Sequence, residues 1–126
     1  MRLSSLASLL SGKLSAPDFS AEIAGELTEH ARSLQTLGGT APVQVTEDTD
    51  LLLDRVGLGV LCRHFATGQL TAGELAYTAD AMQLSERVEF TGPEIASDLA
   101  ECTDPEINGP LTVARALEIA GIGAAA

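Results

Sequence analysis

The chain has 126 residues, a formal net charge of −11 and only seven Lys and Arg residues. This length fits one domain around a single core. The negative charge disfavours nucleic acid and anionic membranes as partners, and it favours either a basic protein partner or solubility alone. With three Phe, one Tyr and no Trp, the core must be built largely from Leu and Ala, which predicts an all-α fold.

The two cysteines, Cys62 and Cys102, are predicted to be buried thiols in a reducing cytoplasm. A helical domain needs no disulfide, and the segment Met1–Ala16 lacks the uninterrupted apolar run of an export signal. No stretch approaches the roughly 18 apolar residues of a membrane span. The predicted location is therefore cytoplasmic.

The first predicted helix covers Leu3–Ser11 and ends at Gly12. Ser15 caps a second helix, Pro17 lies in its first turn, and Asp18 completes a capping box. Its inward face has the helical spacing of Phe19, Ile23, Leu27, Ala31, Leu34 and Leu37. An acidic stripe beside this face consists of Asp18, Glu22, Glu26 and Glu29.

Residues 1–37 thus form a first helical pair, and 38–46 form an exposed link that contains Pro42. Thr46 or Asp48 is predicted to open a third helix whose first turn is acidic. It is the most apolar helix and hence the central one, through Leu52, Leu53, Val56, Val60, Leu61 and Phe65. Gly57 and Gly59 disfavour a helix, so we expect a closely approaching neighbour helix or a kink there.

A fourth helix is predicted over Ala72–Leu84, burying Leu75, Ala79 and Met82. Thr91 and Glu94 suggest a capping box for a fifth helix, with Ile95 and Leu99 facing inward. Thr103 and Glu106 offer a weaker box. Thr112 caps a sixth helix, in which Val113, Leu117 and Ile119 can pack before Gly121 ends it. Residues 47–121 therefore contain helices three to six, and 122–126 form a frayed tail of one domain, 1–126.

One unit occurs twice at an offset of 56 residues, as a helix, the pattern G-x-L-[ST]-A-x-[DE] and a second helix. The copies begin at Gly12 and Gly68. The unit is similar to the second half of a calcium-binding loop, but its ligand positions hold Ala, Leu, Ser, Arg, Phe and Thr, which excludes calcium. A helix-turn-helix DNA reader is also disfavoured, because Ala72–Leu84 carries Glu74 and Asp80 and no Lys or Arg.

Catalytic and metal-binding patterns are missing from the sequence. Cys62, His64, Cys102 and His30 lack the spacing of a zinc site, since residues 62 and 64 point about 200° apart on one helix. Carboxylate pairs such as Asp18 and Glu22 lie on a face that water should reach. The chain has no phosphate-binding glycine loop. We therefore predict no enzyme activity, cofactor, metal or small-molecule substrate.

The segment from Glu86 to Glu106 concentrates the negative charge, with seven acids against the single base Arg87. Glu94, Asp98 and Glu101 recur at helical spacing and predict an uninterrupted acidic ridge opposite Ile95 and Leu99. We predict that a basic protein binds here, with Phe90 as an apolar anchor. The predicted partner-binding residues are Glu86, Glu89, Phe90, Glu94, Asp98, Glu101, Asp104 and Glu106. The stripe from Asp18 to Glu29 is the alternative interface.

The phrase FATGQLTAGELAYTADAM and its earlier echo LLSGKLSAPDF resemble the helix, G-x-[LI]-[ST]-x-x-[DE]-F, helix phrase of small helical bacterial immunity proteins, the colicin-immunity-like group. Leu75 stands where that phrase usually has Phe. The resemblance implies a cytoplasmic acidic bundle that binds and blocks a cognate toxin, often a nuclease with a basic cleft.

The sequence therefore predicts an all-α bundle of about six helices that inhibits a basic partner, with an immunity protein as the best instance. Two alternatives are a phage-type inhibitor that mimics nucleic acid, and a structural or adaptor module whose acidity only keeps it soluble.

Overall fold

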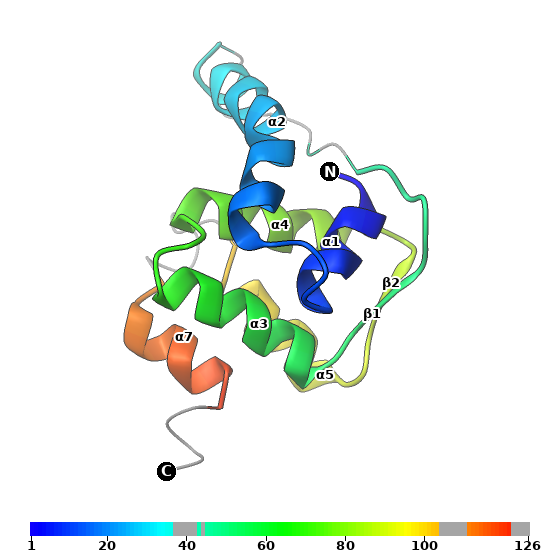
Figure 1. Cartoon of the computed structure of the whole chain (residues 1–126), viewed down its shortest axis with the longest axis vertical. Coiled ribbons are helices and arrows are strands. Elements are labelled where there is room, and N and C mark those ends of the chain that lie inside the picture. Colours follow the sequence, from blue (N-terminus) through cyan, green and yellow to red (C-terminus); the bar gives the residue numbers. More distant parts are fainter. Residues whose placement is uncertain (37–42, 44, 104–110, 122–126) are drawn as a thin grey trace.

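The computed structural model of the protein describes residues 1–36, 43, 45–103 and 111–121, without the side chains of Ala31 and residues 33–36. The described helices are α1 (Leu3–Leu10), α2 (Ala16–Thr36), α3 (Arg55–Ala66), α4 (Ala72–Leu84), α5 (Pro93–Ala100) and α7 (Val113–Ile119). Two short strands, β1 (Leu51–Leu53) and β2 (Val88–Phe90), complete these elements. The predicted all-α class with about six helices is confirmed (Figure 1).

The duplicated unit is a repeat in structure as well as in sequence. Gly12 and Gly68 have φ angles of 82° and 80°, in the left-handed region that favours glycine. After Gly12, the N–H groups of Lys13 and Leu14 donate to the carbonyl of Ser8 at 2.8 and 3.1 Å. After Gly68, the N–H groups of the equivalent residues, Gln69 and Leu70, donate to the carbonyl of His64 at 2.8 and 3.1 Å. Both turns satisfy the last carbonyls of one helix and start the next.

The helix starts in these units follow the prediction in full at Thr71 and in one of the two expected hydrogen bonds at Ser15. The Thr71 hydroxyl accepts from the Glu74 N–H at 3.1 Å, and the Glu74 carboxylate accepts from the Thr71 N–H at 2.8 Å. This reciprocal pair is a complete capping box. In the first unit, Ser15 Oγ accepts from the Asp18 N–H at 3.3 Å. Sequence-local chemistry therefore determines both helix pairs.

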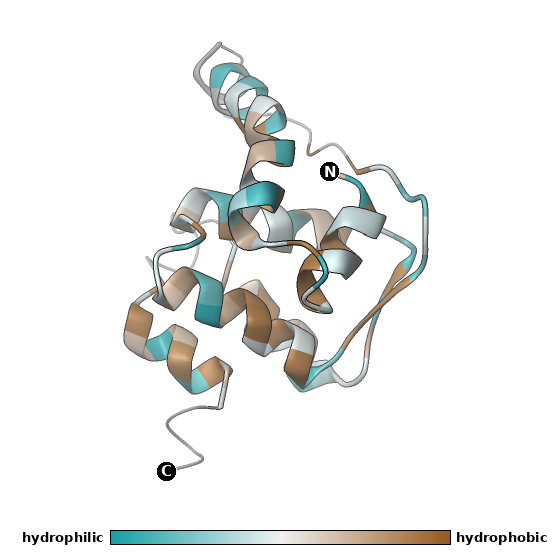
Figure 2. Cartoon of the chain, viewed as in Figure 1, coloured by the Kyte–Doolittle hydropathy of each residue, from teal (hydrophilic) through white to brown (hydrophobic). Residues whose placement is uncertain are grey.

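Helix α3 lies at the centre of the described fold, as predicted, and packs against α1, α4, α5 and α7. A Cβ built on Gly59 would lie 3.7 Å from both the Cα and the carbonyl oxygen of Ala120, just after α7. This distance is an ordinary van der Waals contact, so the end of α7 packs against Gly59 but would also leave room for a Cβ there. Figure 2 shows apolar residues recurring along α3 and α7 and along both strands. The core includes Leu3, Leu6, Phe19, Ile23, Leu58, Leu61, Leu75, Ala79, Met82, Ile95, Leu99 and Ile119.

The predicted start of the third helix is wrong. Residues 51–53 form β1, which pairs in parallel with β2, and Asp54 caps α3 by accepting from the Gly57 N–H at 2.8 Å. The acids before β1 do not lie in a helical first turn. Asp48, for example, accepts from the Ser4 N–H and hydroxyl at 2.9 and 2.6 Å, at the start of α1. These partners are distant in sequence, which is why local helix signals misplaced the boundary.

Three smaller expectations also fail. Thr91 does not cap α5, because its N–H donates to the Leu53 carbonyl at 3.1 Å and extends the pairing with β1, so Gly92 becomes the N-cap. Val56 and Val113 are exposed instead of packed.

The predicted ends of the last helix are confirmed. The Thr112 hydroxyl caps α7 by accepting from the Arg115 N–H at 3.1 Å, and Gly121, with φ 79°, follows the end of α7. Leu37, Pro42 of the predicted link, Glu106 of the weaker box and the tail 122–126 lie outside the described residues, as do the side chains of Ala31 and Leu34.

Candidate functional site

The two strands carry an acidic and apolar surface on their outward side. Because side chains alternate along a strand, Leu51 and Leu53 point inward and Leu52 points outward, where 60% of it is exposed. The register places Leu52 opposite Glu89. A hollow of about 350 Å³ lies here, lined by Asp50, Leu51, Leu52, Glu86, Arg87 and Glu89. We call the exposed residues of this lining, Asp50, Leu52, Glu86, Arg87 and Glu89, the sheet face.

Arg87 holds the two sides of the sheet face together. Its Nε donates to Asp50 at 2.7 Å, and its Nη1 donates to the Glu47 carbonyl oxygen at 2.6 Å. Glu47 accepts in turn from the Ser85 hydroxyl at 3.0 Å and from the Glu86 N–H at 3.3 Å. The hydrogen bond and charge of Arg87 lower the pKa of Asp50. The segment before β1 is therefore fastened to the segment before β2.

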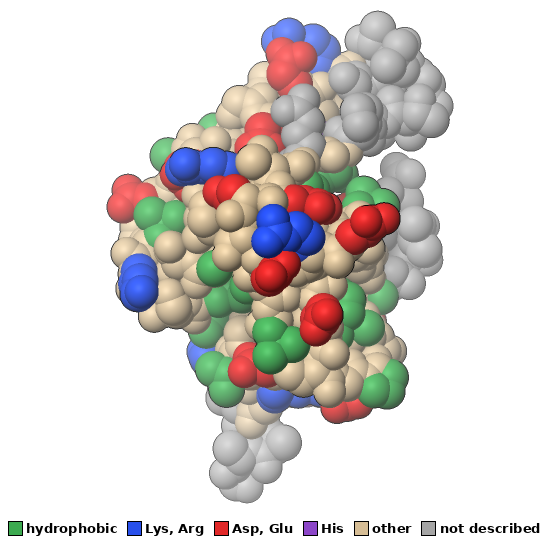
Figure 3. Space-filling model, turned by 90° about the vertical axis from the view of Figure 1, so that its right-hand side faces the viewer, with side chains coloured by type: hydrophobic (Ala, Val, Ile, Leu, Met, Phe, Trp, Pro, Cys, Tyr) green, Lys and Arg blue, Asp and Glu red, His purple; other side chains and the backbone are tan. Residues whose placement is uncertain are grey.

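Two carboxylates of the sheet face are left without a countercharge. Glu86 and Glu89 are exposed, and within the described part of the chain no Lys or Arg forms an ion pair with either. Figure 3 views the side of the molecule that carries the strands, where red carboxylates are interspersed with green apolar side chains and fewer blue Lys and Arg side chains. Exposed Leu52 lies between acids, so the surface combines an apolar centre with negative charge.

The predicted acidic ridge on α5 is wrong as an uninterrupted, solvated feature. Asp98 accepts from Arg55 of α3 at 2.7 Å, and Arg115 of α7 approaches it to 3.7 Å. Arg115 also binds Glu101 through two hydrogen bonds of 2.9 and 2.6 Å. The countercharges come from helices far along the chain, which the local count of one base between residues 86 and 106 could not include.

These ion pairs fasten three helices together. Arg55 Nη1 also donates to the Ile119 carbonyl oxygen at 3.2 Å, and Arg115 pairs with Glu118 at 3.1 Å. The hydrogen bond from Arg115, with its charge, lowers the pKa of Glu101, and the same carboxylate raises the pKa of Arg115. We call Arg55, Asp98, Glu101, Arg115 and Glu118 the ion-pair network. Its arrangement indicates a role in packing α3, α5 and α7.

The predicted partner-binding residues therefore divide into separate groups. Glu86 and Glu89 lie on the sheet face, and Glu94 is exposed in the first turn of α5. Phe90 is partly buried and packs against the core instead of projecting outward. Asp98 and Glu101 belong to the ion-pair network, while Asp104 and Glu106 lie outside the described residues. Sequence reasoning missed Leu52, because the strand pattern that turns it outward was interpreted as a helix.

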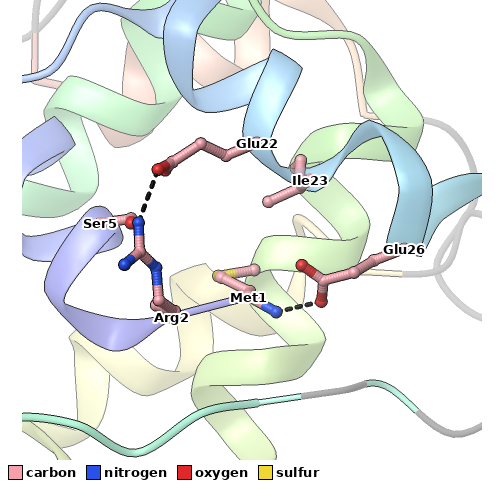
Figure 4. A pocket seen from close by; sticks show the side chains of 6 residues that line it. All are labelled: Met1, Arg2, Ser5, Glu22, Ile23 and Glu26. Atoms are coloured by element: carbon pink, nitrogen blue, oxygen red, sulfur yellow. Dashed lines mark hydrogen bonds and ion pairs between the residues drawn. The ribbon is translucent and has the colours of Figure 1, made fainter.

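The alternative acidic stripe on α2 is largely paired. Glu22 binds Arg2 at 2.8 Å, Glu29 binds Arg32 at 2.9 Å, and Glu26 binds the Met1 ammonium group. Glu26 also accepts from the Tyr77 hydroxyl at 2.9 Å. A hollow of about 150 Å³ lies beside two of these ion pairs and is lined by Met1, Arg2, Ser5, Glu22, Ile23 and Glu26 (Figure 4). Neutralised in this way, the stripe is a weaker candidate for a basic partner than the sheet face.

The candidate metal ligands are not grouped into one site in the described structure. Cys62 and Cys102 are buried free thiols. Burial, together with the positive charge of the neighbouring Arg63, lowers the pKa of His64. Among the residues that the structure describes, no three His, Cys, Asp or Glu side chains are grouped to hold a metal ion. No described helix is both long and apolar enough to cross a membrane.

Comparisons with known proteins give no relative on which to model this site. The chain matches no family model, no curated protein and no solved structure.

Proposed function

We propose that the protein binds a basic protein through the sheet face and inhibits it. The observation that carries this proposal is the combination of exposed Leu52 with Glu86 and Glu89, two exposed carboxylates without ion-pair partners in the described chain. Interfaces commonly place an apolar anchor at the centre and polar groups at the rim. The sheet face has this arrangement, and the net charge of −11 would attract a basic partner from a distance.

The class of partner follows from charge, and the inhibitory role follows from the resemblance to immunity proteins. A basic cleft made for phosphate would be attracted to a surface with unpaired carboxylates, and occupation of the cleft would block its enzyme activity. We therefore propose a cognate toxin, such as a nuclease, as the partner. A nucleic-acid mimic would use the same charge against a different basic target, and an adaptor would bind without loss of the partner's activity.

The test starts with affinity capture from the native host and continues with binding kinetics on the purified partner. Glu86→Lys combined with Glu89→Lys should slow association at least tenfold at low salt, with a smaller difference at high salt, because screening weakens charge steering. Leu52→Ala should instead accelerate dissociation, because the apolar anchor is lost. The activity of the partner, measured at a stoichiometric ratio, then distinguishes an inhibitor from an adaptor.

A matched control carries two reversals of the same sign on α2, Asp18→Lys and Glu29→Lys. Both positions are exposed and lie on a different element from the strands. This control should associate at a rate much closer to that of the wild-type protein than the sheet-face variant does. If the control variant loses binding while the sheet-face variants keep it, the interface lies on α2 and the proposal is wrong.

A further inference from the structure

One edge of β1 has no strand beside it. On the other edge, the Leu51 N–H donates to the Arg87 carbonyl at 3.0 Å, and the Leu53 carbonyl accepts from the residue after β2. Successive residues of a strand direct their backbone groups to opposite edges, so the N–H and C=O of Leu52 point away from β2. The described sheet has two strands, both at the margin of the molecule (Figure 1). Leu52 therefore offers one backbone donor and one acceptor to an added strand.

Two acids flank Leu52 on its own side of the sheet. Side chains two residues apart on a strand share a face, so Asp50 and Asp54 project outward together with Leu52. All three residues are exposed, and the Asp50 side chain is 82% exposed. Asp54 keeps the extended conformation, with φ −111° and ψ −177°, before α3 begins. The outward side of this edge thus presents an apolar residue between two carboxylates.

This arrangement of charges rejects a second copy of the chain as the added strand. Antiparallel pairing of two β1 edges through Leu52 would place Asp50 of each copy opposite Asp54 of the other. Like charges directly opposite each other destabilise a strand pair, and each copy carries a net charge of −11. Charged side chains are a common protection of exposed strand edges against self-association. The same two carboxylates attract a strand that carries Lys or Arg at the facing positions.

We propose that the edge of β1 receives an extended basic segment of the protein partner as a third, antiparallel strand. This inference rests on the proposed function, because it specifies how the basic partner engages the sheet face. The residue of the segment opposite Leu52 exchanges two backbone hydrogen bonds with it. That residue is apolar, because it lies beside Leu52 on the outward side, and the residues two positions before and after it are Lys or Arg, facing Asp54 and Asp50.

Backbone bonds and side-chain contacts contribute differently to this mode of binding. Main-chain hydrogen bonds supply affinity for any extended segment, whereas the side chains on alternate positions select its sequence. Asp50 already pairs with Arg87, whereas Asp54 forms no ion pair within the described part of the chain. Asp54 is therefore the stronger electrostatic contact for the segment. Its carboxylate also accepts from the Gly57 N–H at 2.8 Å, which fixes its position at the start of α3.

The experiment measures amide hydrogen exchange by NMR on the folded, isotopically labelled protein, with capped peptides as probes. In the free protein, the Leu52 N–H should exchange faster than the Leu53 N–H, which faces β2. The peptide Lys-Thr-Val-Thr-Lys should slow exchange at Leu52 by about threefold or more, whereas Glu-Thr-Val-Thr-Glu should not change it. N-methylation of the valine should abolish this protection, because it removes the donor to the Leu52 carbonyl. N-methylation of the following threonine, whose N–H points away from β1, is the matched control and should preserve the protection.

A charge variant of the protein tests the flanking contact. Asp54→Asn keeps the cap of α3, because Asn caps a helix as well as Asp does, but it removes the charge. It should weaken binding of the basic peptide by about threefold at low salt, with a smaller effect at high salt. Asp18→Asn, an equivalent change at an exposed position of α2, should leave the affinity for this peptide unchanged.

Three results would overturn the proposal. Exchange at Leu52 as slow as at Leu53 in the free protein would show that the edge is closed. Chemical-shift changes confined to Glu86 and Glu89, without slower exchange at Leu52, would show a charge contact and no added strand. Equal sensitivity to both N-methylations, or the reverse order, would refute antiparallel pairing.

The outcome is separable from the test of the proposed function. Failure with the peptides leaves the inhibition open, because the reversals at Glu86 and Glu89 test that with the whole partner. If the basic peptide protects Leu52 but the captured partner remains active at a stoichiometric ratio, the inhibitory function is wrong and the strand edge still stands as a binding site.

Discussion

Replacing Gly68 with Ala isolates the energetic cost of a left-handed backbone. Gly68 has φ 80°, and a Cβ added there would have no atom within 4 Å. Ala therefore meets no clash, and the loss of stability comes from backbone strain alone, about 1–2 kcal/mol. For a domain of this size, that loss lowers the midpoint of thermal unfolding by roughly 4–8 °C. Gly68→Val should cost more, because a β-branched side chain restricts the backbone further.

A Gly→Ala substitution inside a helix should instead increase the stability of the protein. Gly25 lies inside α2 with ordinary helical φ, and a Cβ there also has no atom within 4 Å, so Gly25→Ala should stabilise by up to about 1 kcal/mol. Gly12→Ala, in the first copy of the turn, should match the loss at Gly68. Urea unfolding with a common m-value supplies the free energies. A Gly68→Ala variant as stable as the wild-type protein would refute the left-handed turn and the repeat built on it.

Three further predictions concern the ion-pair network and the strands. Asp98→Asn should cost about 1–2 kcal/mol in urea unfolding, because it weakens a charged hydrogen bond to Arg55, whereas Glu94→Gln should change stability by less than about 0.5 kcal/mol. Leu53→Ala should cost about 2–5 kcal/mol since Leu53 is fully buried, and Leu52→Ala less than about 0.5 kcal/mol. The folded-state pKa of Glu101 is lowered, so its ionised carboxylate stabilises the folded protein at pH values above its unfolded-state pKa, near 4.3. This contribution to stability is lost as the pH falls through the lower folded-state pKa. Glu101→Gln should therefore reduce the loss of stability in thermal scans below roughly pH 4, and an identical slope in both proteins would contradict this assignment.

Helix ends were predictable because their chemistry is local. Thr71 and Glu74 cap α4 with atoms three residues apart, and glycine alone accounts for both left-handed turns. The strands were not predictable, because a run of three leucines fits a buried helix as well as a strand. Only pairing with Val88–Phe90, after two intervening helices, selects the extended form.

Only part of the candidate site could be predicted, because the sequence shows local charge but not ion pairs between distant residues. Glu86 and Glu89 were identified from charge density, and the structure leaves them exposed. Asp98 and Glu101 have the same spacing signal, but Arg55 and Arg115 reach them from distant positions in the chain. A sequence shows how many charges a segment carries. It does not show which of those charges another helix neutralises.

The parallel pairing of β1 and β2 also bears on the order of folding. The strands are separated by the α3–α4 helix pair, so Leu51 cannot meet Val88 until a long loop has closed. Local helical contacts form faster than such distant pairings, and we expect the sheet to form after the helix pair. Contacts made late are commonly absent from the transition state, so they slow unfolding more than they accelerate folding. A partner seated on Leu52 and Glu89 would hold together this late-forming part, and its binding would lengthen the lifetime of the native state.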